Sequence, residues 1–283
     1  MKSTARLRWP ILILTLLACV AGFFLRRSQL ASLLEDGSVA PGSRVHIYLL
    51  ILVLAVAAAL AVLIYPLLRQ QSWKSVFDHK PAFQFLHLPA AVALLVGNLI
   101  LLITGEAAEV SVAATAPGVS RALGQLLAPM GLLAALCLGA FAICGLYRKR
   151  PSPLFYIAMT LYLVVRLIVA FQQWNTDPWI HDYCYQLLAS VCCMLASVQL
   201  AGFSFDRGKR RISLFLTLLA ALFCAMTVAD HLRSGASTEN LINLGLLLTM
   251  LASGLQLLFC STQPEEVETP PAPAETAEPK EEE

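Results

Sequence analysis

Apolar residues in this chain gather into eight long blocks, and short polar segments separate the blocks. A helix of about 20 apolar residues crosses the roughly 30 Å hydrocarbon core of a bilayer, whereas barrel strands would show alternating apolar and polar residues. A helix also satisfies its own backbone hydrogen bonds, as lipid requires. The pattern predicts an all-α, polytopic integral membrane helical bundle with eight transmembrane helices, at residues 9–25, 45–68, 85–105, 124–147, 154–171, 183–205, 212–232 and 241–260.

Composition supports the same class of protein. Hydrophobic residues make up 58% of the 283 residues and charged residues only 13%, which is about half the charged share of an ordinary soluble domain. The first and fifth blocks are the shortest, so the ends of these two predicted spans are the least well defined.

Lysine and arginine residues alternate from one inter-block segment to the next. Segments on the side of the N-terminus hold 14 of the 20 basic residues, the other side holds 5, and Arg166 lies inside the fifth block. Cytoplasmic loops carry the excess of Lys and Arg, so we expect both termini to be cytoplasmic.

The first block has a second interpretation. Lys2, Arg6 and Arg8 precede an apolar run in which Cys19 loosely resembles a lipoprotein cleavage site. The apolar residues continue past Cys19, however, and Arg26 and Arg27 then close the block as they would close a membrane span. We therefore favour a retained helix over a cleaved signal peptide.

Residues 261–283 differ in composition from the rest of the chain. They are rich in Pro and contain eight Glu and one Lys, and without them the chain has 19 basic and 10 acidic residues, a net charge of +9. Such a segment buries too little apolar surface to offset its ordering entropy. The sequence predicts a transmembrane domain at 1–260 and a disordered acidic cytoplasmic tail at 261–283.

Arg166 is the most informative polar residue within an apolar block. It lies eight residues, or roughly 12 Å, before Trp174 at the outer end. A guanidinium at that depth costs at least about 2.5 kcal/mol unless it snorkels or finds a partner. Asp230, near the outer end of the seventh block, is the expected partner, and Asp182 is the second choice. Alternatively, Arg166 snorkels and only fixes its helix.

Aromatic and acidic residues surround this position on the outer side. Tyr162 lies one helical turn from Arg166, and Trp174 and Asp177 belong to the following loop. Asp177 and Pro178 form a turn signal, and the aromatic residues suit an interfacial belt. We group Arg166, Asp230, Asp182, Tyr162, Trp174 and Asp177 as a candidate ligand site.

Catalytic and metal-binding motifs are missing from the sequence. It contains no H-E-x-x-H, G-x-S-x-G or phosphate-binding glycine loop, and no Cys or His residues at zinc spacing. The basic runs are juxtamembrane signals that contact anionic lipid, so nucleic acid is an unnecessary inference. We expect the lipid bilayer as partner, no cofactor and no enzymatic activity.

Residues 174–189, W-x-x-D-P-x-I-x-D-Y-x-Y-x-L-L-A, carry a family resemblance. The segment resembles uncharacterised multi-pass membrane proteins of Gram-positive bacteria, over the fifth and sixth blocks and the loop between them. This resemblance implies a bacterial plasma membrane and brings no assigned activity.

Two functions remain in competition, and a membrane enzyme is the least supported. A binding or sensing protein would recognise a ligand at the outer polar and aromatic cluster. A small-solute transporter would need polar groups that continue inward, for which the sequence offers only scattered candidates: Asn98, Thr104, Gln199, Asn243 and Gln256.

Overall fold

The computed structural model of the chain describes residues 7–31, 44–67, 81–104, 119–147, 154–174, 180–203, 205, 208–234 and 237–259. The expected acidic tail, 261–283, and Asp177 lie outside the described residues, as do the side chains of Trp174 and Asp182. The division into a helical domain, 1–260, and a tail therefore stays a prediction.

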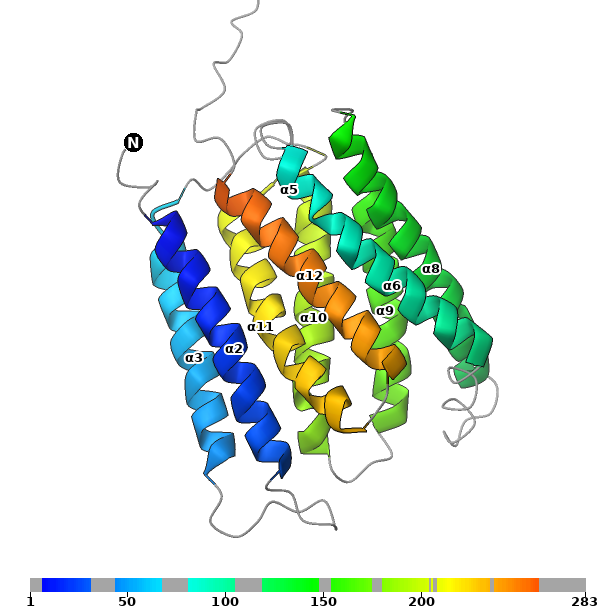
Figure 1. Cartoon of the computed structure of the whole chain (residues 1–283), viewed down its shortest axis with the longest axis horizontal. Coiled ribbons are helices and arrows are strands. Elements are labelled where there is room, and N and C mark those ends of the chain that lie inside the picture. Colours follow the sequence, from blue (N-terminus) through cyan, green and yellow to red (C-terminus); the bar gives the residue numbers. More distant parts are fainter. Residues whose placement is uncertain are drawn as a thin grey trace, which may run out of the picture.

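Every element within these residues is a helix (Figure 1). Seven helices are long and apolar enough to cross a membrane, and an eighth apolar stretch, Phe155–Phe171, is shorter. A bundle of long apolar helices, compatible with a membrane protein, is thus confirmed. The helices are α2 (Arg8–Ala31), α3 (Val45–Ile64), α5 (Pro81–Phe85), α6 (His87–Thr104), α8 (Val119–Leu146), α9 (Leu154–Trp174), α10 (Ile180–Phe203), α11 (Arg210–Ser234) and α12 (Ser237–Phe259).

Helix α2 continues beyond the predicted end of the first span and reaches Ala31. The prediction ended this span at residue 25 because Arg26 and Arg27 follow. In the structure the Arg26 side chain is 1% exposed and is paired with Asp230 of α11. A guanidinium that finds a carboxylate does not have to mark the end of an apolar helix, so the predicted boundary was wrong.

The third span is divided at Leu86, between α5 and α6. Pro89 lacks a backbone N–H and disfavours helical geometry in the preceding residue, so it interrupts the helical hydrogen bonds at this level. The ring of His87 fills part of the gap, because its Nδ1 lies 3.2 Å from the carbonyl oxygen of Gln84. Since that oxygen can only accept, we assign the proton of the neutral ring to Nδ1.

Six helices form a closed ring in which each packs against the next, in the order α6, α8, α9, α10, α11 and α12, with α12 returning to α6. Helix α9 thus lies opposite α12 (Figure 1). Helix α2 packs on the outside of the ring against α11, and α3 packs against α2. A methyl group at Gly97 of α6 would meet Ile242 at 2.7 Å, so this glycine permits the close approach of α12.

Consecutive long helices run in opposite directions, so their ends gather at two levels (Figure 1). The rings of Trp9 and Phe259 lie 5.6 Å apart, which joins the start of α2 to the end of α12. We call this level, at the top of Figure 1, the basic end, and the other the opposite end. The ends of the described helices therefore alternate between two levels, and the orientation with both termini in the cytoplasm stays a prediction.

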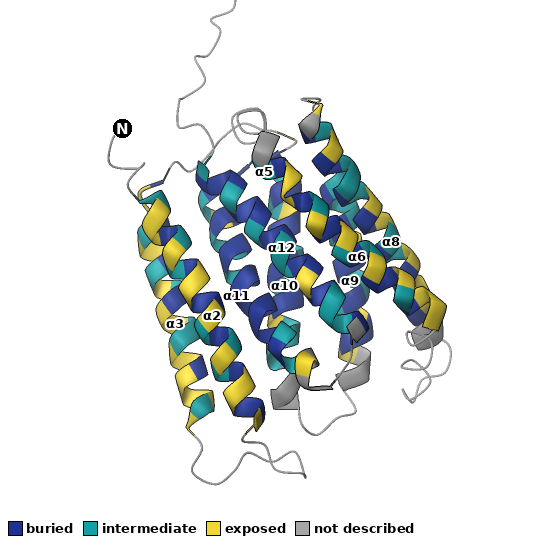
Figure 2. Ribbon diagram, viewed as in Figure 1, coloured by how far each residue is buried: buried dark blue, intermediate teal, exposed yellow. Residues whose placement is uncertain are grey.

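Exposed positions lie on the outward faces of the helices and buried positions in the interior (Figure 2). Many of the exposed residues are large and apolar, and the buried residues include polar ones. A soluble protein rarely exposes large contiguous apolar patches, whereas lipid solvates them. Exposed apolar residues occur along the whole length of α2 and α3, among them Ile13, Leu17, Phe24, Leu50, Leu54 and Val62.

Candidate functional site

Arg166 extends from α9 into the interior of the ring and reaches α12 on the opposite side. Its Nη2 donates to Glu239 Oε2 at 2.7 Å and to Asn243 Oδ1 at 2.8 Å. Glu239 lies in the first turn of α12, where the helix dipole favours a carboxylate. Asn243 follows one turn later on the same face. Charge-assisted hydrogen bonds therefore connect two helices that are not neighbours in the ring.

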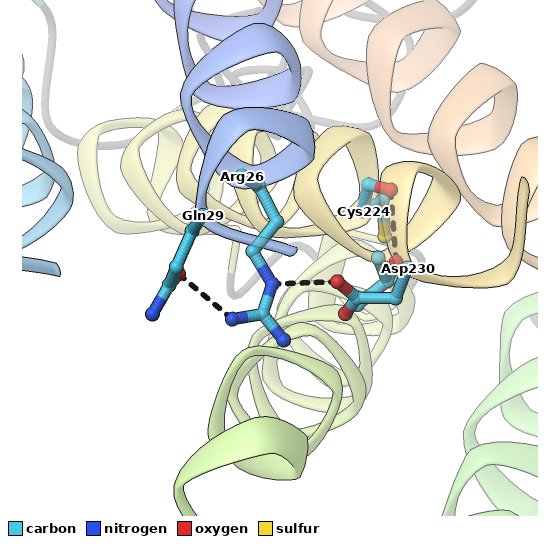
Figure 3. A network of polar contacts seen from close by, with 5 residues as sticks. Arg26, Gln29, Cys224 and Asp230 are labelled. Atoms are coloured by element: carbon cyan, nitrogen blue, oxygen red, sulfur yellow. Dashed lines mark hydrogen bonds and ion pairs between the residues drawn. The ribbon is translucent and has the colours of Figure 1, made fainter. Parts of the chain in front are cut away.

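This pairing differs from the one predicted from the sequence. Asp230 accepts from Arg26 Nε at 2.5 Å (Figure 3), so the expected Arg166–Asp230 pair is wrong. Helix α10 separates α9 from α11 in the ring, and Asp230 is directed at α2, outside the ring. Snorkelling is contradicted as well, because the Arg166 side chain is only 5% exposed.

The Arg26–Asp230 pair and its neighbours hold helices together. Arg26 Nη1 also donates to Gln29 Oε1 at 2.8 Å (Figure 3). Its guanidinium carbon lies 4.9 Å from the centre of the Tyr185 ring. These contacts attach α2 to α11 and α10 at the opposite end. The guanidinium is thus surrounded by a carboxylate, an amide and an aromatic face.

Arg166, in contrast, is surrounded by buried polar atoms without hydrogen-bond partners. These atoms are Arg166 Nη1, Asn243 Nδ2, Asn98 Oδ1 and the hydroxyl of Tyr162. All four side chains are at least nine-tenths buried. An unsatisfied buried polar group costs about 1–3 kcal/mol, so folded proteins rarely leave several together.

Three helices, α6, α9 and α12, contribute the polar side chains around Arg166, and α8 packs against them. The Tyr162 hydroxyl lies beside Asn98 and Arg166 without the geometry of a hydrogen bond. Asn98 Nδ2 donates to the Leu94 carbonyl oxygen at 2.8 Å. The Asn98 amide lies against Gly131 of α8, where any side chain would overlap it. We call Asn98, Tyr162, Arg166, Glu239 and Asn243 the Arg166 cluster.

Two thiols from α10 and α11 approach the same space. Cys193 Sγ and Cys224 Sγ lie 3.4 Å apart as free, fully buried thiols, and both are within electrostatic reach of Arg166. The charge of the guanidinium thus acts on side chains of α10 and α11 as well as on those of α12. No three His, Cys, Asp or Glu residues of the described part of the chain are placed to hold a metal ion.

A second polar cluster lies nearer the basic end. His87 Nε2 is 3.1 Å from Ser253 Oγ, and because Nδ1 carries the proton, Ser253 donates to Nε2. The Tyr156 hydroxyl lies next to that of Ser253. The ring of Phe141 packs edge-on against both His87 and Tyr156, with centroids 5.1 Å apart in each case. We call His87, Tyr156 and Ser253 the His87 cluster.

The two clusters occupy the same three helices. His87 and Asn98 of α6 are eleven residues apart, three full turns, and therefore share one face. On α9 and α12 the corresponding separations are ten residues, or about 15 Å. Most of the buried side chains at intermediate levels are apolar, among them Leu94, Met159, Leu163, Leu246 and Met250. The buried polar exception on α12 is Thr249, whose hydroxyl donates to the Gly245 carbonyl oxygen at 2.7 Å.

Basic residues at the basic end make internal contacts. Arg210 Nε donates to the Leu257 carbonyl oxygen at 2.9 Å and so caps the end of α12. Arg211 Nε donates to the Leu67 carbonyl oxygen at 2.5 Å. From the sequence, both arginines were expected to be topology signals in contact with lipid. Burial of Arg210 at 0% exposure shows that it cannot contact lipid.

Of the candidate ligand residues, the structure brings together Arg166 and Tyr162. Asp230 lies in the separate Arg26 pair, and the remaining three fall outside the described side chains. Sequence reasoning missed Glu239 as a partner and did not consider His87. The spacing of Glu239 and Asn243, four residues apart at the start of an apolar block, was the available signal for one polar face.

Comparisons of the chain with protein-family models, with curated proteins and with solved structures find no match. The resemblance of residues 174–189 to bacterial multi-pass membrane proteins therefore stays an expectation. Inferences about function rest on the chemistry of the ring interior.

Proposed function

We propose that the protein is a multi-pass membrane protein that binds a small polar ligand inside the helix ring, at the Arg166 cluster. The observation that carries this proposal is the set of buried, unpartnered atoms around a guanidinium that bridges α9 and α12. A ligand that pairs with these atoms recovers part of the cost of burying them, about 1–3 kcal/mol for each.

Comparison with Arg26 supports a binding role over a purely structural one. Both arginines are buried and each contacts one carboxylate. The Arg26 guanidinium lies between two further side chains that occupy its edge and its face. At Arg166 both described hydrogen bonds use Nη2, and Nη1 is left open.

Placement in the cell belongs to the same proposal. The excess of basic residues on the side of the N-terminus favours an orientation with both termini in the cytoplasm. The Arg166 cluster would then lie in the outer half of the membrane, where a ligand arrives from outside the cell. The resemblance of residues 174–189 favours a bacterial plasma membrane.

Purification from native membranes tests ligand binding directly. We expect a small molecule to co-purify with the full chain, to be released on denaturation and identified by mass spectrometry, and to be lost from Asn243→Ala. The matched control is Arg26→Gln combined with Asp230→Asn, which removes the charges of the other buried pair and should retain the molecule. A denatured sample that releases no small molecule, or equal release from Asn243→Ala, contradicts the proposal.

A second candidate function is transport of a small solute. The His87 cluster favours it, because it continues the polar lining of α6, α9 and α12 toward the basic end. The apolar layer between the clusters separates them in this conformation, so transport requires a second conformation in which that layer opens. Helix α8 contains Pro129, which cannot donate a backbone hydrogen bond and weakens the ring wall near Gly131.

Cysteine accessibility separates the two functions without knowledge of the ligand. In a cysteine-free background, Asn243→Cys and Ser253→Cys are treated with a membrane-impermeant thiol reagent from each side of sealed vesicles. A transporter exposes both positions to both sides over time. A binding protein exposes only Asn243→Cys, and only from the opposite end.

A further inference from the structure

The Arg166 cluster is already balanced in charge. It contains one guanidinium and one carboxylate at 2.7 Å, and the other described ion pair, Arg26–Asp230, lies outside the ring. A ligand with a net charge would leave one charge uncompensated in a largely dry interior, which is strongly unfavourable. The cluster therefore favours a ligand with no net charge.

The unpartnered atoms require both donors and acceptors from that ligand. Arg166 Nη1 and Asn243 Nδ2 can only donate, whereas Asn98 Oδ1 can only accept. A ligand with acceptors alone would leave the Asn98 oxygen dependent on the neighbouring Tyr162 hydroxyl, and a ligand with donors alone would leave both nitrogens unpaired. The Tyr162 hydroxyl serves in either role.

The positions of these groups also limit the size of the ligand. Asn243 and Glu239 both lie within hydrogen-bond distance of Arg166, and Tyr162 lies beside Arg166 and Asn98. A molecule that contacts all of these side chains at once needs only a few heavy atoms between its donor and acceptor groups.

We propose that the ligand is a small zwitterion of the α-amino acid class, a proposal that rests on the function proposed above. Its carboxylate pairs with Arg166 Nη1 and Asn243 Nδ2, and its ammonium group pairs with the Glu239 carboxylate and Asn98 Oδ1. Guanidinium–carboxylate hydrogen bonds are stronger than neutral ones, which favours a zwitterion over an uncharged amide. Each charge of the protein gains an opposite charge of the ligand, so neutrality is kept.

Within the Arg166 cluster, Glu239 is the side chain that can change its orientation. It is 31% exposed, whereas that of Arg166 is 5% exposed. Glu239 can therefore turn from the guanidinium toward an arriving ammonium group without being transferred into a drier environment. Arg166, held by Asn243, keeps its place. We expect the selectivity for a zwitterion to depend on Glu239 and the affinity for its carboxylate to depend on Arg166.

Four small probes test this assignment with the purified full chain in lipid nanodiscs: glycine, acetate, methylammonium and acetamide. Together they supply a zwitterion, its two charged halves and an uncharged amide of similar size. Binding is measured by calorimetry after removal of any co-purified molecule. We expect glycine to bind at least about tenfold more tightly than each of the other three, the ratio that 1.4 kcal/mol of discrimination gives.

Glu239→Gln provides the decisive variant. Its side-chain amide keeps a hydrogen-bond acceptor for Arg166, so the helix contact persists, but the cluster then carries a net positive charge. We expect acetate to gain at least about tenfold in affinity relative to the unsubstituted protein, and the preference for glycine over acetate to reverse. The control, Arg26→Gln with Asp230→Asn, should leave all four affinities unchanged.

Two results would overturn the assignment of a zwitterion. One is acetate binding the unsubstituted protein as tightly as glycine, and the other is an unchanged ratio of glycine to acetate in Glu239→Gln. If acetamide binds and this binding is lost in Asn243→Ala, the location of the site is correct, but its ligand is an uncharged amide and not a zwitterion. If no probe binds but a small molecule still co-purifies, the zwitterion assignment is wrong and the proposed binding function stands. If nothing co-purifies either, the proposed function fails as well.

Discussion

The Arg26–Asp230 pair gives the most direct quantitative test of the helix arrangement. We consider Arg26→Met, Asp230→Asn and the two combined. Removing one partner of a buried ion pair leaves the other uncompensated and costs about 3–5 kcal/mol, whereas replacing both is close to neutral. The Asp230 side chain is 15% exposed, so residual hydration reduces the cost of stranding it to the lower part of that range.

Arg26→Met also removes other contacts. The guanidinium loses the hydrogen bond to Gln29 and the position over the Tyr185 ring, contacts worth about 0.5–2 kcal/mol each. We therefore expect about 3–5 kcal/mol for either single change. The double variant should lose only about 1–4 kcal/mol, the loss of the Gln29 and Tyr185 contacts, and therefore at least about 2 kcal/mol less than the sum of the single losses.

The assay is reversible unfolding in mixed detergent micelles, followed by tryptophan fluorescence. A parallel cycle with Arg166→Met and Asp230→Asn serves as the control, because Arg166 pairs with Glu239 of α12 and Asp230 pairs with Arg26 of α2. Their losses should add to within about 0.5 kcal/mol. Additive losses for Arg26 with Asp230, together with coupled losses for Arg166 with Asp230, would refute the observed pairing and restore the one expected from the sequence.

Three further predictions concern packing, topology and the tail. Gly131→Ala should cost about 1–3 kcal/mol in the same assay because the methyl group overlaps a buried amide, whereas Gly202→Ala, which has no atom within 4 Å of the added carbon, should not destabilise the protein. In a cysteine-free background, an impermeant thiol reagent applied to intact cells should label Arg44→Cys and spare Lys209→Cys; the reverse pattern inverts the topology. Truncation after Cys260 should shift the melting temperature by less than about 5 °C, and a larger loss would mean that the tail packs on the helices.

The positions of the helices along the chain follow from the sequence because lipid imposes one simple requirement on it. A span has to be apolar over a length set by the bilayer, so eight blocks mark eight long helical segments. The same requirement explains the errors at the ends. Arg26 lies inside α2 because Asp230 compensates its charge, and Pro89 divides α5 from α6 within one apolar block. Neither effect is visible from hydropathy.

Partners inside the bundle depend on the order of helices around the ring, which apolar spacing does not encode. Counting residues gives the depth of a side chain, and by depth alone Asp230 suits Arg166. The side chains nevertheless point in different directions, because α10 lies between α9 and α11, and α12 lies opposite α9. The ring closes through contact between α6 and α12, which are far apart in the sequence and meet at Gly97. From the sequence alone, Gly97 could not be recognised as the site of a close helix contact, because the partner helix was not known.

The two buried arginines show why residue type and depth do not determine function. Both lie near the opposite end, both are buried, and both contact one carboxylate. Arg26 lies at the junction of α2 with the outside of the ring, where an amide and an aromatic ring complete its surroundings. Arg166 lies inside the ring, where the neighbouring donors and acceptors are left open. Stability accounts for the first arrangement. In the second arrangement, unpartnered polar atoms in a buried site cost free energy, and a ligand of matching chemistry removes that cost. The different surroundings of the two arginines therefore direct the search for function to the ring interior.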